Sequence, residues 1–287
     1  MSGMFQLELH DDPKAFAGAV GAWLAEREAE NALLLGLLEA LMREPPAAPP
    51  VMLQATNDGQ TAFAVLDGGH NLVISRGPEG AVEAAAAKLS ALPLEPPGVV
   101  GPVDDAQRFA EAWARARRCD HFLAFDQRIY ELTEVLTPPL VPGAMRAVAL
   151  ADLELVASWG AAFDVETLAA HDQRALDQVR DLLARRIGKR DLFGWEVEGQ
   201  LVSLAGLARP TNRTISINSV YTPPAQRRRG FATALVAAVS REGLARGKER
   251  CVLYTDLANP TSNAIYQKVG YRPVCDSRQY GFRPRAA

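Results

Sequence analysis

The chain has 287 residues, of which 48% are apolar and 23% charged, the balance of a folded globular protein. At about 150 residues per domain, this length predicts two domains. No apolar run approaches the ~20 residues that cross a bilayer, and the N-terminus lacks the basic and apolar regions of a signal peptide. The three cysteines and four histidines are scattered along the chain. We therefore expect a cytoplasmic protein with neither a disulfide framework nor a bound metal.

The net charge of −3 hides a contrast between the two halves of the chain. Residues 1–140 hold 10 Lys and Arg against 20 Asp and Glu, a balance of −10, and residues 141–287 hold 21 against 14, a balance of +7. A basic half favours an anionic ligand, such as a phosphorylated cofactor or a nucleic acid. The alternative is a drift of surface charge that lets the two halves attract each other.

Helices and short strands alternate in the first half. A leucine-rich stripe predicts a long first helix, and Asn57-Asp58-Gly59 and Asp67-Gly68-Gly69 predict hairpin turns. The expected elements are helices at 15–41, 80–92 and 104–118, strands at 51–54, 61–66 and 71–75, and one or two strands within 122–136. Prolines at positions 138, 139 and 142 then predict an extended linker.

The second half repeats this order of elements. Glu198-Gly199-Gln200 predicts a hairpin turn, and Gly270 predicts the end of a helix. The expected strands lie at 145–150, 193–197, 201–207, 214–221, 251–256 and from 271 onward, and the expected helices at 151–159, 168–187, 231–246 and 261–268. Because both halves run from helices through antiparallel strands to a helix, we expect a distant duplication and a mixed α+β fold.

The strongest local signal is a strand that ends in a cationic loop and a helix. The strand ends at Val220-Tyr221-Thr222, the loop contains Arg227-Arg228-Arg229-Gly230, and Phe231-Ala232-Thr233 opens the helix. A helix N-terminus offers free backbone N–H groups and the positive end of the dipole, and Gly230 lets the backbone approach a ligand. These features predict a phosphate cradle, distinct from Walker and Rossmann loops because their glycine patterns are absent. The alternative is a solvated basic turn.

A second motif follows further along the chain. Asn259 precedes Pro260 at the start of a predicted helix, which contains Tyr266 and ends at Gly270-Tyr271. Over about Met145 to Phe282, the chain resembles the GNAT superfamily of acetyl-CoA-dependent acyltransferases. The resemblance rests on Arg227-x-x-Gly230-x-Ala232, which matches the family's cofactor motif, and on Asn259 with Tyr266-x-x-x-Gly270-Tyr271, which matches its later motif.

The first half resembles a second GNAT-like domain that has lost its cofactor loop. Asn31–Glu39 is similar to the opening helix of predicted bacterial acetyltransferases with a tandem plan. The corresponding loop, Arg76–Ala81, lacks the cofactor motif and contains Glu79, which would repel a pyrophosphate. The resemblance implies domains at 1–137 and 138–287, each a mostly antiparallel twisted sheet flanked by helices. It also implies that the second domain alone binds acetyl-CoA.

The resemblance further implies how the cofactor is held. The backbone of Val220 to Thr222 would pair with pantetheine in a gap between two parallel strands, and the N–H groups of Arg228 to Thr233 would bind the pyrophosphate. Asn259 would contact the pantetheine arm or cap its helix. The expected cofactor-binding residues are Val220, Tyr221, Thr222, Arg227, Arg228, Arg229, Gly230, Phe231, Ala232, Thr233 and Asn259.

The implied reaction is direct transfer of an acetyl group to a primary amine in a ternary complex. A backbone N–H near Tyr221 or Thr222 would polarise the carbonyl. Tyr266 stands where the family commonly keeps a general acid, and core packing is its alternative role.

The general base has no clear signal, because the strand at 214–220 contains no acid. The candidates are Glu196 and Glu198, which we expect on one face of an earlier strand. Further alternatives are Asp164, Glu166 and His171, a water chain that ends at Asn218 or Ser219, and an amine that arrives deprotonated.

Two other classes of function compete with the enzyme. A catalytically silent protein that binds or senses acyl-CoA is favoured by the missing base. Nucleic-acid binding through the arginine loop is disfavoured by the pI of about 5.9 and by the few aromatic residues near it. We therefore expect a small-molecule or peptide amine as partner, with neither nucleic acid nor membrane, while acceptor identity and oligomeric state have no sequence signal.

Overall fold

The computed structural model describes residues 5–47, 50–167 and 173–285, and the chain divides into two compact units. The first unit comprises Met1–Ile129, Tyr254–Asn259 and Pro273–Ala287, and the second comprises Tyr130–Leu253 and Pro260–Arg272. The first division therefore falls at Ile129/Tyr130, where the sequence predicted a boundary at 137/138, and two C-terminal segments join the first unit.

The first unit is a sheet with strand order β1-β2-β3-β4-β5-β12-β6. The pairs β1–β2, β2–β3, β3–β4 and β5–β12 are antiparallel, and β4–β5 is parallel. Its strands are β1 (Gln6–His10), β2 (Met52–Asn57), β3 (Gln60–Asp67), β4 (Leu72–Ile74), β5 (Gly98–Pro102), most of β6 (Cys119–Leu132) and most of β12 (Arg272–Pro284). Its helices are α1 (Pro13–Ala25), α2 (Ala32–Arg43), α3 (Glu79–Ser90) and α4 (Val103–Arg117).

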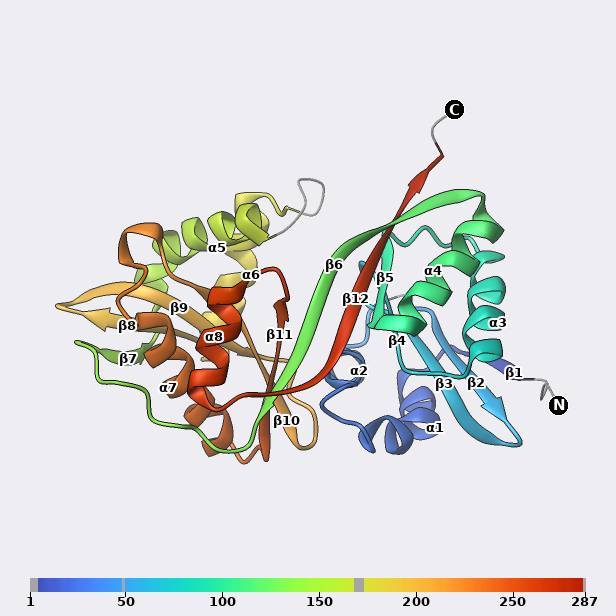
Figure 1. The fold of residues 1–287 in the computed structure, drawn as a ribbon, viewed down its shortest axis with the longest axis horizontal. Coiled ribbons are helices and arrows are strands. Elements are labelled where there is room, and N and C mark those ends of the chain that lie inside the picture. Colours follow the sequence, from blue (N-terminus) through green and yellow to red (C-terminus); the bar gives the residue numbers. More distant parts are fainter. Residues whose placement is uncertain (1–4, 48–49, 168–172, 286–287) are drawn as a thin grey trace. The chain divides into compact units, whose positions relative to one another are not determined.

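Helices cover both faces of this sheet (Figure 1). Side chains alternate along a strand, so consecutive residues of β3 enter different cores. Phe63 and Val65 pack with α3 and α4, whereas Ala64 and Leu66 pack with α1 and α2. The apolar run in β3 thus serves two buried faces, which explains why it shows no polar alternation.

The second unit has strand order β6-β11-β10-β9-β8-β7. The pairs β7–β8, β8–β9 and β9–β10 are antiparallel, and β10–β11 is parallel. Its strands are β7 (Ala144–Ala147), β8 (Leu192–Val197), β9 (Gln200–Ala208), β10 (Thr214–Tyr221) and the start of β11 (Arg250–Asp256). Its helices are α5 (Leu153–Thr167), α6 (Leu176–Gly188), α7 (Phe231–Ala245) and α8 (Pro260–Val269), with short 3₁₀ turns at Leu150–Asp152 and Pro224–Gln226.

The two units repeat one sequence of elements. Three antiparallel strands lead to a strand, a loop, a helix, a parallel strand and a second helix: β4-α3-β5-α4 in the first unit and β10-α7-β11-α8 in the second. In the second unit, α7 and α8 cover one side of the sheet and α5 and α6 pack in a separate core. The predicted α+β class with mostly antiparallel sheets and flanking helices is confirmed.

Three predicted helices differ from the structure, of which the one expected at 151–159 is α5 at Leu153–Thr167. The expected helix at 15–41 is divided into α1 and α2, because the Asn31 side chain turns back and donates to the Leu24 carbonyl oxygen at 3.0 Å. This bond satisfies a carbonyl at the end of α1 and closes the turn. Of the helix expected at 168–187, the structure confirms 176–188, residues 173–175 are not helical, and residues 168–172 lie outside the described part of the chain.

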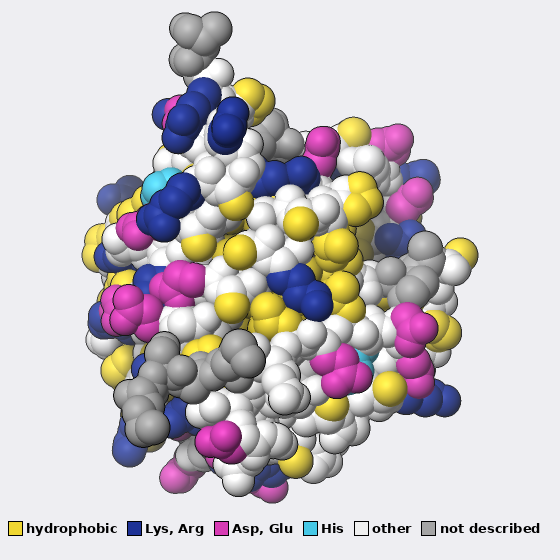
Figure 2. Space-filling view, turned by 90° about the vertical axis from the view of Figure 1, so that its right-hand side faces the viewer, with side chains coloured by type: hydrophobic (Ala, Val, Ile, Leu, Met, Phe, Trp, Pro, Cys, Tyr) yellow, Lys and Arg dark blue, Asp and Glu magenta, His cyan; other side chains and the backbone are white. Residues whose placement is uncertain are grey.

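The surface mixes charge and apolar side chains. On the face shown in Figure 2, basic and acidic side chains are interspersed with apolar ones. Within the described ranges, no helix has the length and apolar character needed to span a bilayer.

Candidate functional site

The parallel pair β10–β11 is short. The register joins Thr214 to Arg250, Ile215 to Cys251 and Ser216 to Val252. On its other edge β10 continues to pair with β9, although the register shifts between Asn218 and Tyr221 and Ser219 has a φ of +52°. The end of β10 is therefore a bulged strand that directs its last residues toward the loop that follows.

Arg186 of α6 holds this bulge. Its guanidinium donates to Asn218 Oδ1 at 2.7 Å, to Ser219 Oγ at 2.9 Å and to the Leu207 carbonyl at 3.2 Å. Burial lowers the pKa of Arg186 to about 10. A Cβ on Gly206 would lie 2.0 Å from the guanidinium, so only glycine leaves room for it. Sequence reasoning missed Arg186, because one arginine on an amphipathic helix is usually solvated.

The loop after β10 closes onto the N-terminus of α7. Gly230 is the N-cap with φ +83° and ψ −2°, a left-handed conformation, and Arg228 has a φ of +62°. In the described residues no side chain caps α7, and no acid lies in its first turn. The first N–H groups of α7 therefore have no capping side chain, and the positive end of the helix dipole lies behind them. Arg227, Arg228 and Arg229 are exposed beside it.

Two carbonyl groups at this strand end are already occupied. Ser203 Oγ donates to the Tyr221 carbonyl at 3.1 Å and lies 2.8 Å from the Thr222 hydroxyl. Arg227 Nε donates to the Thr222 carbonyl at 2.8 Å. Ser203 is fully buried, so its two bonds hold the backbone of Tyr221 and the side chain of Thr222 against β9.

Arg227 is also held by Glu166 from the end of α5. Its Nη2 lies 2.8 and 2.7 Å from the two carboxylate oxygens, and its guanidinium carbon lies 5.7 Å from the Tyr221 ring centre. The Tyr221 hydroxyl lies 3.5 Å from Glu166 Oε1. Burial, and then the Glu166 charge, raise the pKa of Tyr221.

Tyr266 lies on α8 in the core shared with α7. It is 7% exposed, and its ring lies 6.4 Å from Tyr130 and 5.9 Å from Tyr271. Burial raises the pKa of Tyr266 to about 12. Gly270 closes the helix with a φ of +110°, as predicted, and the Tyr271 N–H donates to the Tyr266 carbonyl at 3.0 Å. Tyr266 is thus a protonated phenol in a fixed place.

The two glutamates considered first as bases, Glu196 and Glu198, differ in their surroundings. Glu196 on β8 binds Arg146, which also donates to Asp152 at 2.7 Å. Glu198 is not on the strand face where we expected it: β8 ends at Val197, and Glu198 occupies the hairpin turn with φ +49°.

Of the remaining candidates, buried Asp164 is paired with Arg174 at 2.7 and 2.8 Å. His171 lies outside the described residues. Asn259 directly precedes α8, its N–H donates to the Asp256 carbonyl at 3.1 Å, and it is counted in the first unit. Within the residues that the structure describes, no three His, Cys, Asp or Glu side chains gather as a metal site.

Comparison with known proteins places this geometry in a family. The family model described as acetyltransferase (GNAT) family matches residues 156–271, which contain the bulged β10, the arginine loop and α8. This part of the chain is a GNAT domain.

Solved structures share the fold of the whole chain. A GCN5-related N-acetyltransferase from Sphaerobacter thermophilus is 14% identical with a TM-score of 0.60, covering 98% of this chain and 97% of its own. A tandem GNAT protein from the clavulanic acid biosynthesis pathway is 14% identical with a TM-score of 0.56, covering 98% and 99%. A Drosophila protein is 16% identical with a TM-score of 0.69, covering 99% and 100%. No curated protein matches the chain.

The first unit has a different loop at the position equivalent to the GNAT arginine loop. The Gly77 N–H donates to Asp105 at 3.3 Å, and its carbonyl accepts from Arg108 at 3.3 Å. Burial raises the pKa of Asp105, which also binds Arg108 at 2.7 Å. A Cβ on Gly77 would lie 2.5 Å from Phe63. The loop therefore binds to its own unit through α4, and Glu79 stands in the first turn of α3.

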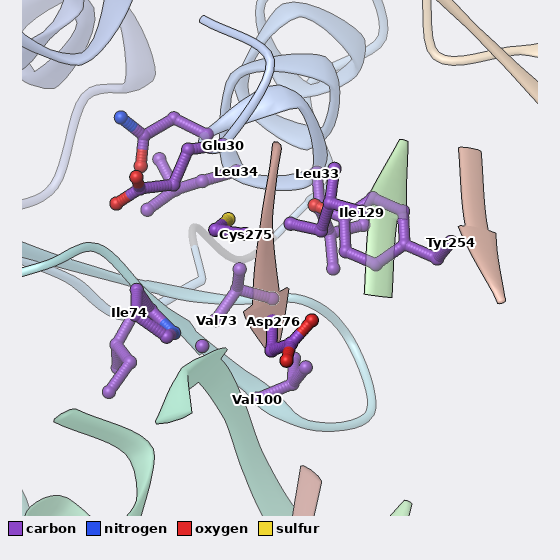
Figure 3. A pocket seen from close by; sticks show the side chains of 13 residues that line it. Glu30, Leu33, Leu34, Val73, Ile74, Val100, Ile129, Tyr254, Cys275 and Asp276 are labelled. Carbon is purple, nitrogen blue, oxygen red and sulfur yellow. The ribbon is translucent and has the colours of Figure 1, made fainter. Parts of the chain in front are cut away.

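A small pocket lies where β4 and β5 part in the first unit (Figure 3). The parallel register ends at Val73 and Val100, and the pocket begins there, beside Ile74 and Cys275. Its volume of about 20 Å³ is the room of one water molecule. Burial raises the pKa of Cys275 to about 12. The pocket beside these two strands therefore has room for no ligand larger than a water molecule.

Proposed function

We propose that the chain is an N-acetyltransferase that moves an acetyl group from acetyl-CoA to a primary amine by direct transfer in a ternary complex. The observation that carries the proposal is the N-terminus of α7, which no side chain of the described residues caps and which follows a left-handed Gly230 beside three exposed arginines. This is a site for a phosphate group. It stands in a GNAT domain, whose family uses acetyl-CoA.

The pyrophosphate of acetyl-CoA would bind the backbone of the loop and the first turn of α7. Two left-handed residues, Arg228 and Gly230, turn successive N–H groups to one side. Arg228 and Arg229 would add positive charge at the rim. The proposed pyrophosphate residues are Arg227, Arg228, Arg229, Gly230, Phe231, Ala232 and Thr233.

The pantetheine arm would extend the sheet at the end of β10. The Tyr221 carbonyl already accepts from the Ser203 hydroxyl of β9. In the chain without cofactor, Arg227 Nε donates to the Thr222 carbonyl. We assign pantetheine pairing to the backbone of Val220 and Thr222, with Asn259 as a further contact.

Acetyl-CoA supplies an activated acetyl thioester when it is bound. The Thr222 N–H would polarise the thioester carbonyl, while the amine forms the new C–N bond and the C–S bond breaks. Tyr266 would give its phenolic proton to the departing sulfur, and the proton that the acceptor nitrogen releases would return to Tyr266 through water. With its pKa raised to about 12, Tyr266 holds that proton at neutral pH.

A silent acyl-CoA-binding protein remains the second candidate. It is favoured by the surroundings of the two candidate bases. Glu196 is paired with Arg146, and Glu198 lies in a hairpin turn rather than on the strand. Turnover separates the two functions. Full-length protein is incubated with acetyl-CoA and a panel of primary amines, and free thiol and acetylated amine are both measured. We expect equal amounts of the two products, dependent on protein and amine. Binding of acetyl-CoA with no product from any amine would support the silent protein.

A further inference from the structure

A residue at the end of α5 and a residue at the end of β10 both contact the guanidinium of Arg227. The Glu166 carboxylate oxygens lie 2.7 and 2.8 Å from Arg227 Nη2, and the Tyr221 ring lies 5.7 Å from the guanidinium carbon. The Tyr221 hydroxyl also reaches Glu166, at 3.5 Å. A carboxylate and an aromatic face on one cation are the groups that recognise ammonium and guanidinium ligands.

The aromatic face is held in place by the rest of α5. Trp159 lies 6.3 Å from the Tyr221 ring at an angle of 48°, and Phe163 lies 6.5 Å from it at 89°. Ser203 fixes the backbone of Tyr221 from below. The ring is therefore pre-positioned and would stay in place without Arg227.

Arg227 is bound in a way that allows exchange. Arg227 and Glu166 are each 42% exposed, and an ion pair this open to water is weak. Arg227 also belongs to the loop to which we assign the pyrophosphate. The cofactor pyrophosphate competes well for a guanidinium, because its two phosphoryl groups together carry two negative charges and the Glu166 carboxylate carries one.

We propose that Glu166 and the Tyr221 ring form the subsite for a positively charged group of the acceptor, and that Arg227 fills it until cofactor phosphate draws the arginine away. The inference rests on the proposed function and names its substrate class. The acceptor is an amine with a second cationic group, such as a diamine or an alkylguanidine. The second group stays charged in the subsite while the reacting amine is neutral.

Calorimetric titration with agmatine tests the subsite without cofactor, because agmatine carries a guanidinium like that of Arg227. The proteins are full-length wild type, Arg227→Ala, Arg229→Ala and the double variant Arg227→Ala with Glu166→Gln. Arg229 is the matched control, since it lies 4.8 Å from the Phe231 ring and binds Gln226 rather than a carboxylate. We expect agmatine to bind Arg227→Ala about ten-fold more tightly than wild type. Arg229→Ala should match wild type, and Glu166→Gln should remove the gain.

Equal agmatine affinity in Arg227→Ala and wild type, or a gain that survives Glu166→Gln, would overturn the subsite. A second titration uses wild type saturated with coenzyme A, where the proposal predicts the same gain. If coenzyme A binds and agmatine affinity is unchanged, the displacement of Arg227 is wrong. If coenzyme A does not bind, the proposed function fails, and the Arg227→Ala titration still decides the subsite.

Discussion

At the scale of single residues, Tyr266 is the group whose chemistry is easiest to isolate. Tyr266→Phe removes the hydroxyl and keeps the ring in contact with Tyr130 and Tyr271. We expect kcat to fall about 100-fold, as for a lost general acid, with acetyl-CoA affinity and melting temperature unchanged. The measurements are steady-state kinetics with a turned-over amine, calorimetry and thermal unfolding. Full activity in the phenylalanine variant would reduce Tyr266 to a packing role.

The raised pKa of Tyr266 also fixes the sign of the pH dependence. An acid must be protonated to act, and with a pKa of about 12 this phenol stays protonated below that pH. Raising the pH deprotonates the amine first. The rate in wild type should therefore rise with pH and not fall through Tyr266 ionisation before about pH 10.

Gly206 tests whether Arg186 holds the β10 bulge. Gly206→Ala puts a Cβ 2.0 Å from the guanidinium and 2.9 Å from the Asp191 carbonyl, so Arg186 must leave Asn218 and Ser219. Overpacking of this kind lowers the free energy of unfolding by about 2 kcal/mol. Gly188→Ala, at the end of the same helix as Arg186, meets nothing within 4 Å and is the control. Urea denaturation gives both values, and equal stability in the two variants would contradict the account.

Residue-level predictions succeeded where the signal is local. Gly270 and the Asp58-Gly59 and Glu198-Gly199 turns have positive φ, as their neighbours in sequence indicate. The ion pair of Glu166 with Arg227 and the contacts of Arg186 join residues on different elements. No spacing in the sequence encodes such pairs, because each depends on how a helix packs on the sheet.

At the scale of elements, the loop between β10 and α7 contains an arginine, Arg228, in a backbone conformation that lowers the free energy of unfolding. Arg228 has a φ of +62°, which costs an arginine about 1 kcal/mol and a glycine almost nothing. Arg228→Gly should therefore raise the free energy of unfolding by up to about 1 kcal/mol while acetyl-CoA binds more weakly. Arg229→Gly loses the same charge without relieving a positive φ, so it should not stabilise. Denaturant titration and calorimetry on both variants check this, and a destabilised Arg228→Gly would refute it.

Elements were predicted well where turns or caps mark their ends. The β2–β3 and β8–β9 hairpins and the start of α8 at Pro260 agree with the sequence analysis. The single helix expected at 15–41 was wrong, because no glycine or proline marks the turn and a side-chain amide closes it. A bond from Asn31 to Leu24 can be seen only in the folded chain.

At the scale of the whole molecule, one chain carries two related units with different loops. The GNAT domain keeps an open helix N-terminus. The first unit binds its own Gly77 through Asp105 and Arg108 and leaves about 20 Å³ where its parallel strands part. The tandem arrangement could be read from the repeated order of elements. The contacts of Gly77 could not, because they depend on how α4 packs beside this loop.

The central claim is that one acetyl-CoA binds per chain at the N-terminus of α7, and calorimetric titration with acetyl-CoA tests it most directly. Gly230→Glu places a charge at the phosphate site, where a Cβ would lie 2.9 Å from Val141 and φ is +83°. Gly247→Glu is the matched control, with φ +82° just past the other end of α7 and open space around it. We predict one site per chain in wild type and in Gly247→Glu, and none in Gly230→Glu. Two sites per chain, or undiminished binding in Gly230→Glu, would contradict the claim.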